Sequence, residues 1–197
     1  MKSAALAKRL SERYDRAIKY CTLPIEQVHP SSRIIVGCVD NGPAREAISR
    51  LGAGSHWWID TGNAQNYGQI LIGNNNFARF VTNTEVVMDL PTPDIQRPEI
   101  LLQAPEQPNC AAPPADDGQG PTINQTMAAM ALEVIRRLIA GDCPWMQLIV
   151  DMDKGTMSPV LATPKNCQLI MKTKSKDKII LIKEEASGNQ TRNPNQG

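Results

Sequence analysis

An acidic residue stands where an apolar segment of this chain gives way to a turn and a helix. The segment spans residues 33–45 (RIIVGCVDNGPAR), and Asp40 follows its apolar run. In an open α/β sheet, ligands bind in the crevice outside the carboxyl ends of the strands. Asp40 is therefore predicted to lie where a nucleotide or its metal ion would bind. A turn carboxylate that caps the next helix is the structural alternative.

The residues after Asp40 predict an abrupt change from strand to helix. Gly42 is a tolerated N-cap, and Pro43 suits the first helical turn because its missing N–H would be unpaired there. A second apolar strand, residues 56–60, also ends in an acid, Asp60, and a T-G-N turn follows it. Asp60 and Asn63 are candidates for the same crevice, although a tight turn explains them equally well.

The cysteines do not form a recognisable zinc motif. Their number is odd and no C-x-x-C pair occurs, whereas structural zinc sites usually recruit such pairs. No zinc is expected. Cys110 lies in a proline-rich segment, where a thiolate could be presented to a reactant, but its neighbours supply no charge to activate it. Cys21 and Cys38 are predicted to be buried apolar residues.

Charge and hydropathy limit the class of protein. The chain has 197 residues, with 21 Lys and Arg against 20 Asp and Glu, which gives a formal net charge of +1. That balance provides no electrostatic footprint for nucleic acid, and no run of about twenty apolar residues could span a membrane. The first residues lack the apolar stretch of a secretory signal. A cytoplasmic protein without nucleic-acid or membrane partners is expected.

The periodicity of apolar residues predicts an α/β fold. Apolar residues recur at three- and four-residue spacing in three segments, and short apolar runs bounded by turn residues mark the strands. The order predicts a Rossmann-like mixed sheet with flanking helices. The predicted helices cover residues 4–21, 44–51 and 122–140, and the predicted strands after the one before Asp40 cover residues 56–60, 69–72, 147–151 and 158–161.

Three segments differ in composition from the rest of the predicted domain, which covers residues 1–163. Prolines crowd residues 88–121, which predicts a long excursion over the surface without regular helices or strands. A lysine-rich hairpin is expected within residues 164–185. Residues 186–197 are polar and lack aromatic side chains, and they are expected to be disordered.

The order of five short motifs resembles the latter two thirds of a ThiF-type adenylyltransferase, a bacterial relative of ubiquitin-activating enzymes. Within that family the ThiF-like proteins of PRTRC cassettes, which occur on mobile genetic elements, are the most similar. The similarity covers roughly residues 2–161, and the order and spacing of the motifs carry it. The motifs are Lys2 at the start of a helix, D-N-x-x-x-R at Asp40, Asn41 and Arg45, W-I-D-T-G-N at 58–63 before G-Q-I-L-I-G at 68–73, the lone Cys110, and I-N-Q-T-M at 123–127.

The resemblance implies an ATP-dependent activation of a carboxylate. The C-terminal glycine of a ubiquitin-like or sulfur-carrier protein would attack the α-phosphate of ATP and become an acyl adenylate. Asp40 would hold Mg²⁺ or orient the triphosphate, Asn41 would share the nucleotide site, and Lys2 would reach a phosphate. Arg45 would anchor the helix behind the site. Cys110 would be the thiol that takes the activated carrier or forms a persulfide-type intermediate, and a bystander role in the loop is the favoured alternative. A homodimer is also implied.

The chain departs from the family in the part that grips the nucleotide. In the family a glycine-rich strand-turn-helix precedes the position of Lys2, and no G-x-G-x-x-G occurs in this chain. The expectation is a domain truncated on its N-terminal side, either an incomplete reading frame or a degenerate relative without ATP binding. Three functions stay open: the adenylyltransferase, a non-catalytic carrier-binding module, and half of a Rossmann-type dehydrogenase.

Overall fold

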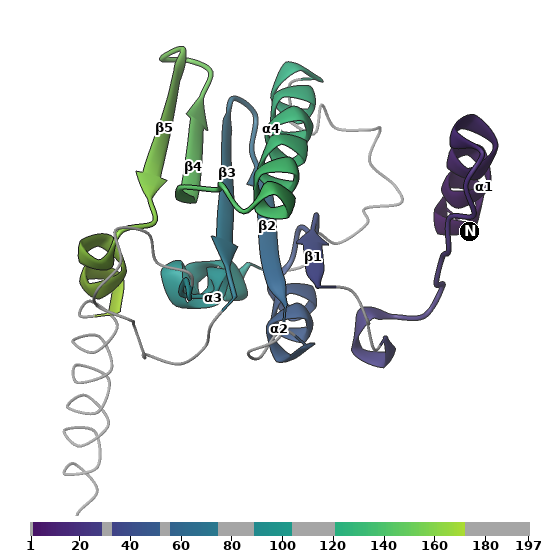
Figure 1. Cartoon of the computed structure of the whole chain (residues 1–197), viewed down its shortest axis with the longest axis horizontal. Coiled ribbons are helices and arrows are strands. Elements are labelled where there is room, and N and C mark those ends of the chain that lie inside the picture. Colours follow the sequence, from purple (N-terminus) through teal and green to yellow (C-terminus); the bar gives the residue numbers. More distant parts are fainter. Residues whose placement is uncertain (1, 29–32, 52–55, 75–88, 104–120, 172–197) are drawn as a thin grey trace, which may run out of the picture.

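A mixed five-stranded sheet forms the centre of the protein. The computed structural model describes residues 2–28, 33–51, 56–74, 89–103 and 121–171. The strands lie in the order β1-β2-β3-β4-β5 (Figure 1), with β1 and β2 parallel and the other neighbours antiparallel. Helices flank this sheet, so the predicted α/β fold with a mixed sheet is confirmed. The strands are β1 (Ile34–Gly37), β2 (Trp57–Asn63), β3 (Tyr67–Gly73), β4 (Trp145–Asp151) and β5 (Thr156–Leu161).

The long helix α4 (Pro121–Ala140) covers one face of the sheet. Successive side chains of a strand point to opposite faces, so alternate apolar residues of β3 can meet the same helix. Ile70 and Ile72 are fully buried in the cluster that α4 completes with Ile123, Met127 and Val134. The helix was predicted over residues 122–140 from its apolar spacing, and the structure confirms it to within one residue.

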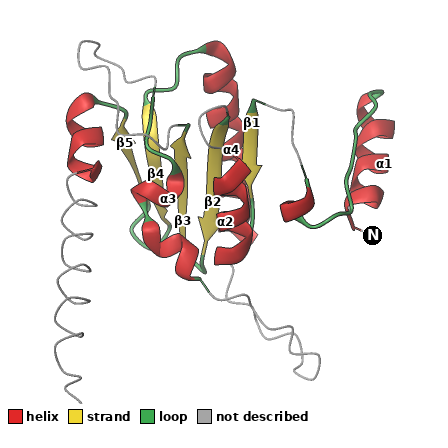
Figure 2. Cartoon of the chain, turned by 90° about the horizontal axis from the view of Figure 1, so that it is seen from below, coloured by secondary structure: helices red, strands yellow, loops and turns green. Residues whose placement is uncertain are grey.

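Shorter helices cover the opposite face (Figure 2). They are α2 (Gly42–Leu51), which connects β1 to β2, α3 (Pro93–Gln96) and the 3-10 helix η2 (Pro98–Leu102). Leu71 points to this face, between the two isoleucines that face α4. It packs with Ile48 of α2, Trp58 of β2 and Ile100 of η2.

The proline-rich segment is not, in its described part, the surface excursion that its composition predicted. Residues 89–103 form α3 and η2 and lie against the sheet, with Leu90, Ile95 and Ile100 buried. The prolines do not prevent these helices because Pro93 and Pro98 occupy their first turns, where a missing N–H costs nothing. Residues 104–120, Cys110 among them, lie outside the described residues.

The predicted hairpin after residue 163 is wrong in its first part. Residues 164–171 are helical, and Cys167 of this helix is fully buried against the sheet. Thr163 begins the helix as an N-cap, since its hydroxyl oxygen accepts a hydrogen bond from the Asn166 N–H at 3.2 Å. The lysine-rich sequence that suggested an edge strand and the predicted disordered tail lie outside the described residues.

The first helix is shorter than predicted. α1 (Lys2–Tyr14) ends at Asp15, whose φ of +48° takes the backbone out of the right-handed helix. The chain then turns back, and the Ile18 N–H donates to the Ser11 hydroxyl at 3.0 Å. Both views show α1 apart from the sheet, beyond β1 (Figures 1 and 2). Cys21 in the following segment is exposed, contrary to the prediction.

β1 lies at one edge of the sheet. Within the described residues β1 pairs with β2 alone, so one side of β1 carries no neighbouring strand. Val36 of this strand is 40% exposed.

None of the helices in the described part of the chain is both long and apolar enough to cross a membrane.

We expect Gly73→Ala to destabilise the protein by about 1–3 kcal/mol. A Cβ at Gly73 would lie 2.0 Å from the Pro91 carbonyl oxygen and 2.7 Å from the Thr92 Cα, so the backbone of residues 91–92 would have to move. Urea unfolding followed by circular dichroism measures the change. Gly62→Ala is the matched control in β2, because its Cβ would meet nothing closer than 3.5 Å. Equal midpoints for the two variants would contradict this account of the close approach.

Candidate functional site

A cavity of about 810 Å³ opens at the carboxyl ends of β1 and β2. The parallel pairing of these strands brings both ends to one edge of the sheet. The crevice inferred from the sequence therefore exists, and Asp40 lies on its wall. The cavity is lined by Cys38, Val39, Asp40, Arg45, Thr61, Gly62, Asn63, Ala64, Tyr67, Gln69 and Gln103.

Asp40 and Asn41 form the turn that starts α2. The carboxylate of Asp40 is exposed and accepts a hydrogen bond from Asn41 Nδ2 at 2.9 Å. Asn41 Oδ1 accepts the Ala44 N–H, also at 2.9 Å. Asn41, and not Gly42, is thus the N-cap of α2. This capping role accounts for Asn41 without a ligand.

The first turn of α2 has few donors to offer an anion. The Gly42 N–H donates to the Gln103 carbonyl at 2.8 Å, and Pro43 has no N–H. The Ala44 N–H is taken by Asn41. Helix N-termini bind phosphate through free amides of this kind. In α2 these amides already have acceptors within the protein.

Arg45, which lines the cavity, forms a buried ion pair with Asp60. Arg45 of α2 and Asp60 of β2 are 2% and 0% exposed, and Arg45 Nε lies 3.1 Å from both carboxylate oxygens. Arg45 Nη1 also donates to Gln103 Oε1. Asp60 lies within β2, which continues to Asn63, so the predicted turn directly after Asp60 is wrong. Arg45 anchors α2, as the sequence analysis expected.

Burial raises the pKa of Asp60 to about 6, and the Arg45 guanidinium beside it opposes that rise. The carboxylate gains an ion pair and loses its hydration, and the loss of hydration is the larger effect. Asp60 is therefore charged at neutral pH and can take up a proton in mildly acidic solution. The pair balances the charge of Arg45, so this arginine is not a free cation for a phosphate.

The opposite wall of the cavity is polar and uncharged. Thr61 Oγ1 lies 3.1 Å from the Gly37 carbonyl oxygen, to which it donates, and 3.3 Å from Cys38 Sγ. Asn63 Nδ2 donates to Asn124 Oδ1 of α4, which joins the I-N-Q-T-M segment to this wall. Cys38 is exposed, so its predicted burial is wrong, and its thiol lies in the cavity wall.

The structure brings some predicted site residues together and not others. Asp40, Asn41 and Arg45 adjoin the cavity or line it. Lys2 begins α1, which stands apart from the sheet, and it is not among the residues that line the cavity. Cys110 lies outside the described residues. No three His, Cys, Asp or Glu side chains gather as a metal ligand set within the described ranges.

Sequence reasoning missed the pairing of Arg45 with Asp60 and the contribution of Gln103. A signal for the pair was present, because each charge sits among apolar residues, Arg45 three residues before Ile48 and Asp60 at the end of W-W-I-D. Two opposite charges on facing apolar surfaces are expected to pair, since an unpaired buried charge is costly. Gln103 had no such signal, because the segment before it was interpreted as surface.

Comparison with known proteins adds no family to this description. Neither the models of protein families nor the curated proteins give a match to the chain.

We expect Arg45→Met to destabilise the protein by about 3–5 kcal/mol at pH 8, because it leaves the Asp60 carboxylate buried without a partner. The double variant Arg45→Met/Asp60→Leu should recover most of that loss, since no buried charge remains. Urea unfolding at pH 8 measures both. Arg50→Met is the control on the same helix: the Arg50 side chain is 74% exposed in its pair with Glu46 and should matter little. Equal effects at Arg45 and Arg50 would contradict the buried pair.

The raised pKa of Asp60 also predicts a pH dependence. In the window from about 4 to 6 the folded protein keeps a proton on Asp60 that the unfolded chain releases. The contribution of Asp60 to the free energy of unfolding should therefore fall by about 3 kcal/mol as the pH rises through this window. Over this pH window the free energy of unfolding of the wild type should fall by this amount relative to that of Arg45→Met/Asp60→Leu. A ¹³C titration of the Asp60 carboxyl with its midpoint near pH 4 would be inconsistent with this account.

Proposed function

We propose that this chain belongs to an ATP-dependent adenylyltransferase that activates the C-terminal carboxylate of a ubiquitin-like or sulfur-carrier protein. The observation that carries the proposal is the cavity at the carboxyl ends of β1 and β2 with the exposed Asp40 carboxylate on its wall. Its volume lies within the usual range for small-molecule sites. The resemblance of the motif order to ThiF-type adenylyltransferases suggests the reaction.

Asp40 suits a magnesium ion that is carried by a nucleotide. Mg²⁺ is commonly bound through one or two carboxylates together with substrate phosphates and water, and does not need a cage of protein ligands. Bound there, the ion would neutralise phosphate charge while the carrier carboxylate attacks the α-phosphate and pyrophosphate leaves. Asn41 orients the Asp40 carboxylate through its 2.9 Å hydrogen bond, and Arg45 fixes α2 beneath it.

The described residues do not supply a phosphate cradle. The α2 amides have acceptors, Arg45 is neutralised by Asp60, and the cavity wall holds no other Lys or Arg among the described residues. On this proposal the groups that grip the phosphates come from elsewhere than the described part of the chain. Asp40 and the cavity provide the metal and the space for the reacting carboxylate.

The same observation favours a second function, a carrier-binding module without ATP chemistry. A cavity whose backbone amides are already hydrogen-bonded can receive a glycine C-terminus and still be unable to hold a triphosphate. The two functions differ in what ATP does. The enzyme requires Mg²⁺ and ATP to change the carrier, whereas the module captures the carrier equally well in their absence.

We expect Asp40→Ala to lower magnesium-dependent exchange of pyrophosphate into ATP by about 100-fold or more, since the metal loses its protein ligand. The assay uses the full chain with sulfur-carrier or ubiquitin-like proteins that end in glycine. Asp142→Ala is the control, because Asp142 is an exposed carboxylate beyond the end of α4 and outside the cavity. Exchange that survives Asp40→Ala would remove the metal role. Carrier binding with no exchange by the wild type would favour the module.

A further inference from the structure

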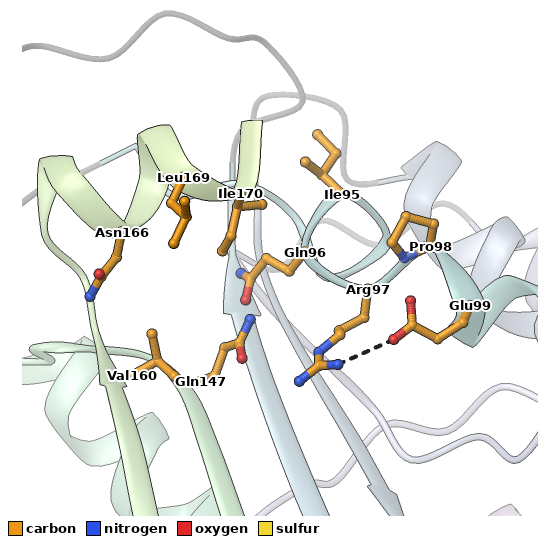
Figure 3. Close-up of a pocket in the computed structure, with 10 residues that line it drawn as sticks. All are labelled: Ile95, Gln96, Arg97, Pro98, Glu99, Gln147, Val160, Asn166, Leu169 and Ile170. Carbon is orange, nitrogen blue, oxygen red and sulfur yellow. Dashed lines mark hydrogen bonds and ion pairs between the residues drawn. The ribbon is translucent and has the colours of Figure 1, made fainter. Parts of the chain in front are cut away.

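A second cavity, of about 420 Å³, lies on the face of the sheet that carries α3 (Figure 3). It shares no lining residue with the cavity beside Asp40. Its walls come from α3 and η2, from β4 and β5, and from the helix at residues 164–171. The lining residues are Ile95, Gln96, Arg97, Pro98, Glu99, Gln147, Val160, Asn166, Leu169 and Ile170.

Gln96 presents an unpaired acceptor to this cavity. The residue is 7% exposed, and its Nε2 donates to the Ile72 carbonyl at 2.8 Å and to the Pro91 carbonyl at 2.6 Å. These two bonds fix the orientation of the carboxamide, because the opposite orientation would set its oxygen against two carbonyl oxygens. Gln96 Oε1 is buried without a hydrogen-bond partner. Such a group calls for an N–H or O–H donor.

Two other polar groups lie beside that acceptor. Gln147 is 6% exposed, and its carboxamide points toward that of Gln96 (Figure 3). Arg97 lies next to Gln96 at the mouth, where its Nη1 donates to Glu99 at 3.3 Å. The guanidinium has five donors, and no other acceptor for them is found among the described residues.

Apart from Glu99 and Asn166, the remaining lining residues are apolar and limit the size of a ligand. Ile95 and Pro98 contribute from one side, and Val160 and Ile170 from the other (Figure 3). These side chains suit a branched aliphatic group. Arg97 is the one cation among the described lining residues and is already paired with Glu99, so a singly charged carboxylate suits the cavity better than a phosphate dianion.

We infer that this cavity binds a carboxylate whose neighbouring atom carries an N–H and whose side chain is aliphatic. An N-acyl amino acid and the C-terminal residue of a peptide share this chemistry. The N–H donates to Gln96 Oε1, the carboxylate accepts from the Arg97 guanidinium, and the aliphatic group packs between Val160 and Ile170. Gln147 supplies a second carboxamide to the acyl or peptide carbonyl.

The first test titrates the ¹⁵N-labelled full chain with N-acetyl-leucine and with a short peptide that ends in leucine, followed by NMR. A saturable shift of the resonances of residues 95–99, 147 and 166–170 is expected, with a dissociation constant of about 1 mM for N-acetyl-leucine. If the peptide binds at least as tightly as N-acetyl-leucine, the ligand of this cavity is the C-terminus of a protein. Binding of N-acetyl-leucine alone identifies a free metabolite.

Variants and analogues test each contact. Arg97→Gln should weaken binding about tenfold or more, since a hydrogen bond to a charged group is lost. Arg136→Gln is the matched control: Arg136 is also an exposed arginine, paired with Glu133 on α4, and its loss should leave binding unchanged. The ester analogue, 2-acetoxy-4-methylpentanoate, replaces the N–H by oxygen and should also bind about tenfold more weakly.

Three results would overturn the inference. The first is the absence of a saturable shift with both probes. The second is an equal effect of Arg97→Gln and Arg136→Gln, and the third is equal affinity for the amide and its ester analogue. Gln96 itself is not substituted, because its Nε2 hydrogen bonds join α3 to the end of β3 and its loss would confuse folding with binding.

Discussion

The buried pair of Arg45 and Asp60 is the interaction on which the arrangement around the first cavity depends. It joins α2 to the middle of β2, and through Gln103 it also holds the chain that leaves η2. Separating the two side chains would leave each charge buried and unpaired, which costs several kcal/mol. The pair therefore fixes where α2 begins relative to the end of β1. That in turn fixes where Asp40 and Asn41 stand.

The parts of this fold that follow from local pattern were predictable from the sequence. The apolar spacing of α4 indicated this helix to within one residue, and the turn between β4 and β5 indicated two short strands to within two residues. α4 buries one continuous apolar face against the sheet, so its periodicity reflects a single neighbour. The crevice at Asp40 was predictable for a related reason, because the change from strand to helix is encoded within a few residues.

The errors arose where tertiary contacts override composition. Prolines suggested a surface loop at residues 89–103, yet Ile95 and Ile100 cover the sheet there. Local pattern cannot show that an apolar residue spaced among prolines meets a distant strand. The pairing of Asp60 with Arg45, fifteen residues apart, was missed for the same reason. Cys38 was predicted to be buried by its apolar neighbours, but the chain passes out of the sheet there and exposes its thiol.

The two cavities differ in which polar groups lack a partner within the described part of the protein. These groups decide what each cavity can bind. Around Asp40 the buried donors are already used: Arg45 by Asp60, and the α2 amides by Gln103 and Asn41. What remains there is an exposed carboxylate, a group that attracts cations. In the second cavity the remaining groups are a buried acceptor on Gln96 and those N–H groups of Arg97 that do not donate to Glu99 and have no other acceptor among the described residues. A polar group that is hydrogen-bonded within the protein stabilises the fold, whereas one without a partner can bind a ligand. This difference underlies the two proposals, a metal-borne substrate for the first cavity and an acid with its own N–H for the second.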